Sequence, residues 1–367
     1  MKVIILGTRG LPPRYGGRET ATDEIGRRLV ALGHDVVVYG RARGTRRRER
    51  VYGGIQVVDL PTVTAKGWDS LVHVLGSAAD VAVRRRRGVV VLSDVGTSVA
   101  IPLLRATGHR TVWWVDGPAW ERSKWSWLGR TYLRLAASLG IRLADEVIID
   151  SRSAARYYEE RFGREADYIP YGASVAPVES TDTLEELGLE PGRYVLFVGR
   201  LTPEKGLHHL VEAWSAVRSD HRLVIVGDNP YDRPYVETLR SRADERVVFA
   251  GYRFDEAFAQ LMRHCAVYVQ PSEVEGTSPV LLTAMGYARP VIVQGIPENL
   301  ETIGDAGLAF PPGRVDDLSA HLQCLLDDPV EAERWGERAA RRVREVYDWD
   351  DIAQRFAEVC DRAQTGR

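Results

Sequence analysis

Lysine, cysteine and long apolar runs are all scarce in this 367-residue chain. Its three cysteines, Cys265, Cys324 and Cys360, show no Cys-x-x-Cys or Cys/His spacing, which argues against structural zinc and favours a reducing, cytoplasmic compartment. No uncharged apolar stretch reaches about 18 residues, so we expect no transmembrane helix. The opening run MKVIILGTRG lacks the apolar region and cleavage site of a signal peptide and predicts a first β-strand.

Charge of one sign is also lacking, because the net charge is only −2. This balance excludes a general electrostatic attraction to nucleic acid. The 49 basic residues include just four lysines, Lys2, Lys66, Lys124 and Lys205. An arginine excess of this kind is typical of GC-rich coding, so arginine clusters carry little information. A lysine in a loop carries more.

Two series of short apolar runs alternate with helical patterns, as expected of parallel sheets buried on both faces. The runs are Val3–Leu6, Asp35–Tyr39, Ile55–Leu60, Val89–Leu92, Thr111–Val115 and Glu146–Ile149, then Tyr194–Val198, Arg222–Val226, Val247–Ala250, Val267–Gln270 and Pro290–Val293. The segment Tyr171–Pro191 between the series is rich in Gly, Pro, Ser and Thr and reads as a linker with one short helical piece.

The pattern predicts an α/β protein with two doubly wound, Rossmann-like domains. We place the domains at residues 1–172 and 173–349, with a final helix at about 350–363 that packs back on the first. Ligands of such sheets bind beyond the carboxyl ends of the strands, so the crevice between the domains is the expected site.

The first candidate segment runs from Gly7 to Glu19, between the first strand and the first helix. Gly16 and Gly17 stand just before the helix, where glycine lets backbone approach an anion and the helix dipole adds partial positive charge. A long Pro-rich connection is the alternative interpretation. The spacing is not Gly-x-Gly-x-x-Gly, which disfavours a dinucleotide site.

The second segment, Gly199–Gly206, follows the first strand of the second domain. Arg200 and Lys205 leave the strand end and approach a helix start. A guanidinium fork and a compact ammonium suit a diphosphate. Two ordinary surface cations would be the alternative, but lysine is scarce here.

The third segment surrounds the start of another helix, where Ser278 is a natural N-cap and Pro279 a natural first residue. Backbone amides of Gly276, Thr277 and Ser278 would then form an anion site. Glu275 stands just outside it and could accept hydrogen bonds from sugar hydroxyls.

The fourth segment follows the fifth strand, where Asp116 is ringed by aromatic residues. This arrangement is typical of an acceptor pocket, although an Asp turn before Gly-Pro is the simpler alternative. We take as candidate acceptor contacts Arg14, Tyr15, Trp114 and Trp120.

Together the four segments resemble the group 1 family of retaining nucleotide-sugar glycosyltransferases, which have the GT-B fold. The family motifs G-R-x-x-x-x-K-G and E-G-x-x-x-x-x-x-E-A-M are matched by Gly199-Arg200…Lys205-Gly206 and by Glu275-Gly276…Thr283-Ala284-Met285. The first half is similar to the bacterial polysaccharide rhamnosyltransferase-type branch in Gly7-Thr8-Arg9-Gly10, in Val115-Asp116-Gly117 and in Tyr168–Ala173. The resemblance covers essentially the whole chain.

This resemblance implies that Arg200 and Lys205 hold the donor diphosphate and that Glu275 contacts the donor sugar. It implies that Gly16 and Gly17 approach the phosphates, and that the turn containing Arg253 lies beside the nucleobase. Asp116 would stand on the acceptor side.

One position departs from the family pattern. Thr283 replaces the glutamate that binds ribose hydroxyls in relatives, and a neutral, shorter side chain binds them more weakly. Three consequences are open. The donor could be a deoxynucleotide sugar such as a dTDP-sugar, another residue could bind the ribose, or the activity could be lost.

The resemblance implies front-face substitution, in which the leaving diphosphate takes the acceptor's proton. The two cations and the helix start would stabilise that leaving group without a metal or other cofactor. The sequence Asp348-Trp349-Asp350 is a formal D-x-D match, but it lies outside any strand–loop context and reads as the start of the last helix.

Acceptor and location stay open at this stage. A saccharide, a lipid-linked acceptor or a natural-product aglycone would fit. The arginines at 41–50 and 84–87, beside an amphipathic stretch with Trp68, Leu71, Val74 and Leu75, would dock the inner face of an anionic plasma membrane or simply form a solvated face. A nucleotide-sugar epimerase and a degenerate nucleotide-sugar-binding partner are the alternative functions.

Overall fold

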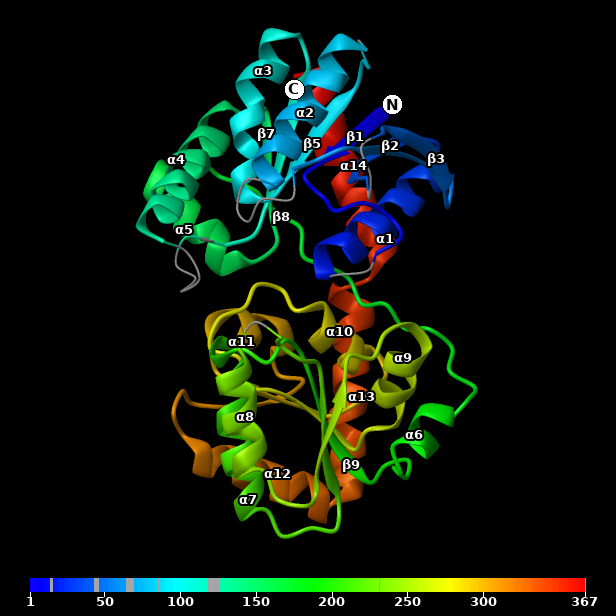
Figure 1. Cartoon of the computed structure of the whole chain (residues 1–367), viewed down its shortest axis with the longest axis vertical. Helices are drawn as coiled ribbons and strands as arrows, with labels where there is room; N and C mark the ends of the chain where they lie inside the picture. The colour runs from blue at the N-terminus through cyan, green and yellow to red at the C-terminus, as the bar shows by residue number, and fades with distance from the viewer. Residues whose placement is uncertain are drawn as a thin grey trace. The chain divides into compact units, whose positions relative to one another are not determined.

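The computed structural model describes residues 1–13, 16–42, 46–63, 69–84, 86–117, 120, 126–230 and 232–366. The chain forms two compact units (Figure 1). The N-terminal unit comprises Met1–Tyr171 and Trp349–Arg367, and the C-terminal unit comprises Gly172–Asp348. These divisions lie within a residue of the predicted ones, and the last helix, α14 (Trp349–Thr365), belongs to the N-terminal unit.

The sheet of the N-terminal unit has the strand order β3-β4-β2-β1-β5-β6-β7-β8 and is parallel except at β3. Its strands are β1 (Lys2–Leu6), β2 (Asp35–Arg41), β3 (Arg48–Tyr52), β4 (Ile55–Leu60), β5 (Val89–Ser93), β6 (Arg110–Val115), β7 (Glu146–Ile149) and β8 (Asp167–Tyr168). The central strands are apolar throughout because helices cover both faces.

Two successive residues of β6, Trp113 and Trp114, point to opposite faces of the sheet, and helices cover both faces. Trp113 of β6 lies in the core formed with α2 (Asp69–Val83), α3 (Ile101–Ala106), α4 (Trp127–Leu143) and α5 (Arg152–Phe162). The next residue, Trp114, packs edge-on against Phe356 of α14, with ring centroids 5.3 Å apart. Helix α14 also packs against α1 (Gly17–Ala31), so these two helices cover the second face.

The sheet of the C-terminal unit is wholly parallel, with the order β11-β10-β9-β12-β13-β14. Its strands are β9 (Tyr194–Val198), β10 (Arg222–Val226), β11 (Val247–Gly251), β12 (Val267–Gln270), β13 (Val291–Gln294) and β14 (Leu308–Phe310). The helices are α6 (Asp182–Glu186), α7 (Leu207–Ala216), α8 (Arg233–Arg242), α9 (Asp255–His264), α10 (Pro279–Gly286), α11 (Pro297–Ile303), α12 (Val315–Asp327) and α13 (Pro329–Val346). The two doubly wound α/β units confirm the predicted fold class.

Each sheet has one point where the chain reverses its direction of winding. In the N-terminal unit this switch point lies between β1 and β5, and in the C-terminal unit between β9 and β12. The loops that leave such neighbouring strands diverge and create a ligand crevice at the carboxyl edge of the sheet. Three of the four segments singled out in the sequence follow these strands, and the fourth, around Asp116, follows β6, the neighbour of β5.

Glycine is required at both switch points. Gly7 has φ +99°, and a Cβ there would lie 2.3 Å from the Ser93 carbonyl oxygen. Gly206 has φ +64°, and a Cβ would lie 1.8 Å from the Pro271 carbonyl oxygen. Only glycine allows both this backbone conformation and this approach. The loops after neighbouring strands are therefore held in backbone contact.

Candidate functional site

The switch point of the C-terminal unit brings together a lysine and a glutamate from distant parts of the sequence. Lys205 ends a short 3₁₀ turn, Pro203–Lys205, after β9, and Glu275 lies in the loop after β12. The Lys205 ammonium donates a hydrogen bond to Glu275 Oε1 and forms an ion pair with it. The side chains are 21% and 13% exposed, so the pair is sheltered and still reachable.

The two loops are tied together by backbone as well. The Glu273 amide donates to the Glu204 carbonyl oxygen at 3.0 Å, next to the close approach of Gly206 to Pro271. This bracing fixes the positions of Lys205 and Glu275. A rigid site of this kind loses little free energy to reorganisation when charge develops in it.

A buried polar network fixes the start of α10. The Ser278 hydroxyl donates to Gln270 Oε1 at 2.8 Å and accepts from the Leu281 amide at 3.4 Å, as an N-cap does. The Gln270 amide nitrogen in turn donates to Asn299 Oδ1 at 2.8 Å. The helix start is thus held beside Glu275, and its dipole favours an anion there.

Arg200 lies in the same loop after β9 as Lys205, and its side chain is more exposed to solvent than that of Lys205. Its side chain is 59% exposed, and its guanidinium lies 3.9 Å from Glu204. A long, exposed arginine beside a sheltered lysine could reach a bound diphosphate without prior desolvation. The predicted residues Gly276, Thr277 and Ser278 follow Glu275 directly, with Thr277 and Ser278 buried.

Thr283 lies inside α10 and not on the rim. Its hydroxyl donates to the Pro279 carbonyl oxygen at 2.9 Å, and the residue is only 7% exposed. The hydrogen atom of that hydroxyl is therefore used within the helix. The predicted donor contact through Thr283 has no geometric support, because its short side chain turns back along its own helix.

Arg253 follows β11 and makes a forked ion pair with Glu186 at 2.9 and 3.1 Å. Its guanidinium is thereby committed to α6, and its predicted place beside a nucleobase stays a prediction. Its neighbours Tyr252 and Phe254 are 49% and 59% exposed, and their rings stack with centroids 5.8 Å apart. This aromatic platform at the carboxyl edge was not expected from the sequence, apart from the Gly-Tyr-Arg turn that contains Tyr252.

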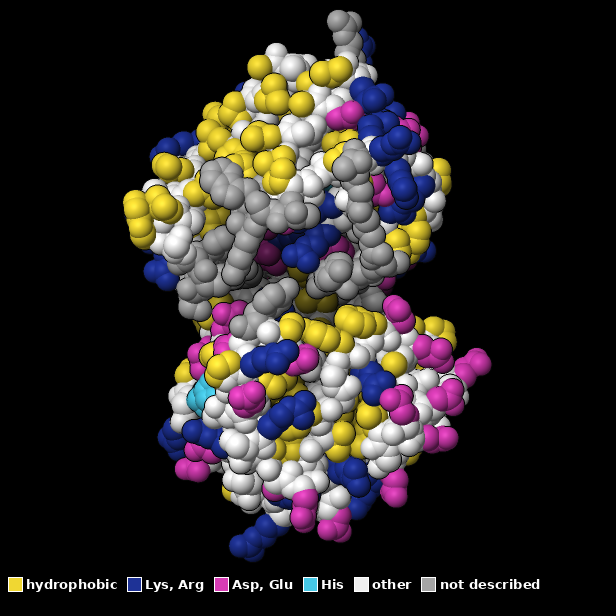
Figure 2. Space-filling model, viewed as in Figure 1, with side chains coloured by type: hydrophobic (Ala, Val, Ile, Leu, Met, Phe, Trp, Pro, Cys, Tyr) yellow, Lys and Arg dark blue, Asp and Glu magenta, His cyan; other side chains and the backbone are white. Residues whose placement is uncertain are grey.

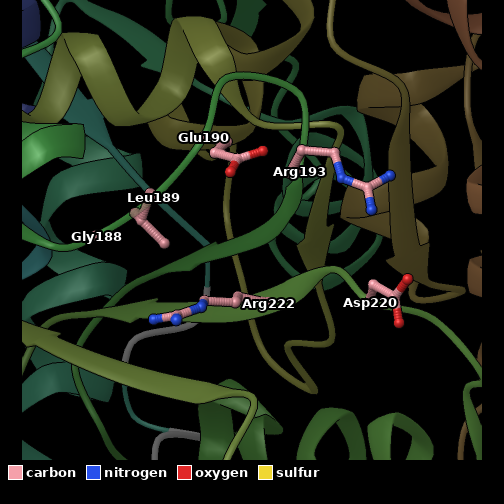
Figure 3. Close-up of a pocket in the computed structure, with 6 residues that line it drawn as sticks. All are labelled: Gly188, Leu189, Glu190, Arg193, Asp220 and Arg222. Carbon is pink, nitrogen blue, oxygen red and sulfur yellow. The ribbon is translucent and has the colours of Figure 1, made fainter.

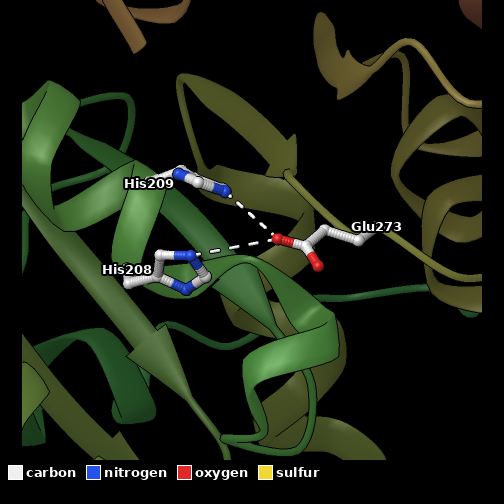
Figure 4. Close-up of side chains that lie close together, drawn as sticks. All are labelled: His208, His209 and Glu273. Atoms are coloured by element: carbon white, nitrogen blue, oxygen red, sulfur yellow. Dashed lines mark hydrogen bonds and ion pairs between the residues drawn. The ribbon is translucent and has the colours of Figure 1, made fainter. Parts of the chain in front are cut away.

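Two imidazoles and a carboxylate gather beside the same loops. His208 and His209 of α7 point toward Glu273, with His209 Nε2 3.2 Å and His208 Nε2 3.9 Å from Glu273 Oε1 (Figure 4). Among the described residues this is the group whose ligand atoms, all within 4.8 Å of one another, could hold a metal ion. Burial, then the neighbouring His209, lowers the pKa of His208, so its ring is neutral at neutral pH.

In the N-terminal unit, Arg18 of α1 forms an ion pair with Asp116, which follows β6 at the carboxyl edge of the sheet. The Arg18 guanidinium donates to Asp116, to the Ser93 hydroxyl at 3.0 Å and to the Trp114 carbonyl oxygen at 3.3 Å. Tyr171 donates to Asp116 at 3.2 Å. Burial opposes the charge on Arg18, yet nearby groups, Tyr171 first, raise its pKa. The sequence reasoning missed Arg18, because its partners lie 75 to 98 residues away.

Two predicted acceptor contacts are wrong for side-chain binding. Trp114 is 1% exposed and packs on Phe356 and Tyr171, while Trp120 is 3% exposed and packs on Tyr157 and Tyr158. Both indoles are buried in the unit: that of Trp114 lies between β6 and α14, and that of Trp120 packs against α5. Only their backbone could meet a ligand.

The remaining predicted residues of this unit lie around the start of α1. Gly17 is its first residue, and the Gly16 carbonyl oxygen accepts from the Thr20 amide at 3.2 Å. No side chain caps this helix start. Arg14 and Tyr15 lie outside the described residues.

A separate cavity of about 320 Å³ lies at the opposite edge of the C-terminal sheet (Figure 3). Its lining residues are Gly188, Leu189, Glu190, Arg193, Asp220 and Arg222. Arg193 precedes β9 and Arg222 begins β10, so the cavity faces the amino ends of the strands. It is therefore not part of the switch-point site.

Comparison with known families identifies the two units. Residues 16–172 match the model described as glycosyl transferase 4-like domain, and residues 192–328 match that of glycosyl transferases group 1. Both halves of the chain are thus similar to glycosyltransferase domains. The group 1 model covers both Lys205 and Glu275, and neither match supports the epimerase alternative.

Individual relatives of these glycosyltransferase domains are distant. Alpha-D-kanosaminyltransferase of Streptomyces kanamyceticus is 31% identical over 243 residues, covering 64% of this chain. The chain spans 62% of the length of that relative. Sucrose-phosphate synthase from Thermosynechococcus elongatus superimposes with a TM-score of 0.86 at 20% identity over the whole of both chains, which confirms the predicted two-domain GT-B fold. Anabaena HepE, solved in complex with UDP-glucose, matches with a TM-score of 0.79 at 20% identity over 98% of this chain and 99% of its own.

Proposed function

We propose that this protein transfers a glycosyl group, with retention of configuration and without a metal, from a nucleotide-diphosphate sugar to an acceptor hydroxyl. The observation that carries the proposal is the sheltered Lys205–Glu275 pair at the C-terminal switch point, next to the start of α10. Cation, carboxylate and helix start are the three groups that a sugar diphosphate requires.

The diphosphate is the leaving group, and its developing charge is the main obstacle to the reaction. Lys205 offers a point charge, Arg200 an exposed fork, and α10 the positive end of its dipole. Because these groups are already in place, they stabilise the departing oxygen without reorganisation. They supply the charge that a divalent cation would otherwise bring.

Glu275 is placed to hold the sugar. Its carboxylate accepts a hydrogen bond from Lys205. When the diphosphate draws the lysine, the carboxylate becomes available to hydroxyls of the sugar. The bond from the anomeric carbon to the phosphate oxygen breaks as the acceptor oxygen bonds to that carbon on the same face. The acceptor proton passes to the departing phosphate oxygen.

The N-terminal unit would hold the acceptor. Asp116 is 29% exposed and fixed by Arg18 and Tyr171, so it can accept a hydrogen bond from an acceptor hydroxyl in one defined orientation. With Arg18 as partner, the carboxylate acts as an orienting group, and proton removal stays with the donor phosphate.

Donor and acceptor classes follow from the residues around these groups. The stacked pair Tyr252 and Phe254 offers a face to a nucleobase. Thr283 gives no charged ribose contact, which favours a deoxynucleotide donor such as a dTDP-activated deoxysugar, rhamnose among them. A saccharide, a lipid-linked sugar or a natural-product aglycone would serve as acceptor.

The test is a donor screen followed by stereochemistry. Purified protein is incubated with UDP-, GDP-, ADP- and dTDP-sugars, a set of acceptors, and either EDTA or Mg²⁺. Proton NMR of the product reads the anomeric configuration. An α-linked product from an α-donor, formed equally with EDTA, supports the proposal. An inverted product refutes retention, and a requirement for Mg²⁺ refutes metal independence.

A further inference from the structure

Helix α4 of the N-terminal unit exposes large apolar side chains that no function so far explains. Trp127, Leu128 and Leu135 are 74%, 61% and 67% exposed. The helix contains no aspartate or glutamate, and its charged residues are Arg130, Arg134 and Arg142. An apolar face with only basic charges is unusual for a helix that merely meets water.

The orientation of α4 is fixed by its inner face. Leu133, Ala136, Ala137, Gly140 and Ile141 are buried. Gly140 lies so close to Trp113 that a Cβ would approach the indole to 2.6 Å. The helix is therefore seated tightly on the sheet. It cannot roll to bury the tryptophan and leucines on its outer face.

At 3.6 residues per turn, the exposed residues form one continuous stripe. Trp127, Leu128 and Leu135 share the outward side, and Arg130 and Arg134 flank it along one edge. Among the described residues neither Arg130 nor Arg134 has an ion-pair partner. The stripe thus combines apolar bulk with uncompensated positive charge.

Neighbouring helices extend this apolar surface. Helix α3 packs against both α2 and α4. Val72 and Leu75 of α2 and Leu103 of α3 are 40%, 39% and 38% exposed. Figure 2 shows hydrophobic side chains gathered over this part of the N-terminal unit. The apolar surface is therefore wider than a single helix. We call it the docking face, and it consists of Trp127, Leu128 and Leu135 of α4, Val72 and Leu75 of α2, and Leu103 of α3.

The arginines at 41–50 and 84–87, which the sequence suggested for membrane contact, are not those of α4. Several of them form ion pairs with carboxylates of the same unit. Arg41 pairs with Asp69, Arg50 with Asp59, and Arg84 with Asp80. Arg47 and Arg86 both pair with Glu49. These clusters are internal ion-pair networks of the edge strands and α2, and the stretch beside them buries Val74 in the core.

We propose that the docking face of α2, α3 and α4 binds the surface of an anionic membrane. Trp127, Leu128 and Leu135 enter the interfacial region, where indole and leucine side chains are favoured. Arg130 and Arg134 meet lipid phosphates. No helix in the described part of the chain is long and apolar enough to span a bilayer, and this face lies on the surface without crossing it. The proposal does not depend on catalysis.

Vesicle co-sedimentation tests it. The wild-type chain is mixed with vesicles of phosphatidylcholine alone and with vesicles that also contain phosphatidylglycerol. We expect binding to the anionic vesicles only. Arg130→Glu with Arg134→Glu, and separately Leu128→Ser with Leu135→Ser, should each lower the bound fraction by about tenfold or more. Circular dichroism and a thermal melt verify that each variant is folded.

Matched controls lie on α13 of the C-terminal unit. Arg341→Glu with Arg344→Glu makes the same charge change at exposed positions, and Val330→Ser removes an apolar side chain that is 60% exposed. These variants should bind vesicles as the wild type does. Wild-type protein that stays in the supernatant, or α4 variants that bind unchanged, would overturn the proposal. So would a dimer that α4 substitutions dissociate while vesicles fail to bind.

Discussion

Lys205 and Glu275, which lie 70 residues apart, form an ion pair at the carboxyl edge of the C-terminal sheet. The pair joins the loops that leave β9 and β12, the two strands between which the winding reverses. Both side chains remain partly exposed to solvent, at 21% for Lys205 and 13% for Glu275. Each side chain stabilises the charge of the other and can still exchange its partner for a ligand.

Glu275→Gln separates sugar binding from diphosphate binding. The amide keeps the shape of the side chain and loses its charge, so kcat/KM should fall by about 100-fold or more. Affinity for the free nucleoside diphosphate should hold or rise, because Lys205 is released from its partner. Glu273→Gln is the matched control in the same loop. Equal losses of diphosphate affinity and kcat/KM in the Glu275 variant would contradict the assigned role.

Thr283→Glu introduces the carboxylate that the motif E-G-x-x-x-x-x-x-E-A-M has at this position. Because the charged group can accept hydrogen bonds from ribose hydroxyls, UDP should bind about tenfold more tightly than to the wild type. dUDP, which lacks the 2′-hydroxyl, should gain less. Calorimetric titration of both nucleotides measures the difference. Identical gains for the two nucleotides would show that the hydroxyl contact is absent.

Arg18→Lys probes the acceptor side. Lysine retains the charge but loses the fork that reaches Ser93, Asp116 and the Trp114 carbonyl at once. We expect kcat/KM for the acceptor to fall by about tenfold or more while affinity for the nucleoside diphosphate is unchanged. Arg27→Lys, which alters the partly buried pair with Asp23 on the same helix, is the control. A loss of donor affinity alone would refute the assignment.

His73 makes the stability of the N-terminal unit depend on pH. The ring is buried, its Nε2 lies 2.8 Å from the Gly40 carbonyl oxygen, and burial lowers its pKa. Below about pH 6.5 the unfolded chain takes up a proton that the folded chain excludes, so the free energy of unfolding falls as pH falls. His73→Gln removes this contribution. Its denaturant midpoint should therefore change less than that of the wild type between about pH 7.5 and 5.5.

The parallel strands were the most predictable part of the fold. Continuous β-branched runs such as Tyr194–Val198 coincide with β9 because a strand buried on both faces must be apolar throughout. The polar edge strand β3 and the short strands β8 and β14 carry no such pattern and were missed.

Residues of a rare type were easier to single out from the sequence than residues whose surroundings depend on a distant partner. Lys205 stood out as one of four lysines, whereas Arg18 was hidden among many arginines. Trp114 was predicted to contact the acceptor because it lies next to the Asp116 segment, but β6 is buried on both faces, so the indole packs against Phe356 and Tyr171. The hydrogen bond that occupies Thr283 depends on helix geometry that its spacing alone does not reveal.

Binding of nucleoside diphosphates tests the central claim most directly. Thermal shift with UDP, GDP, ADP and dTDP on the wild type and on Lys205→Ala measures it, since a ligand of the native state raises its melting temperature. We predict that at least one diphosphate stabilises the wild type, that its monophosphate does so far less, and that Lys205→Ala abolishes the shift. An undiminished shift in the folded Lys205→Ala protein would contradict the account.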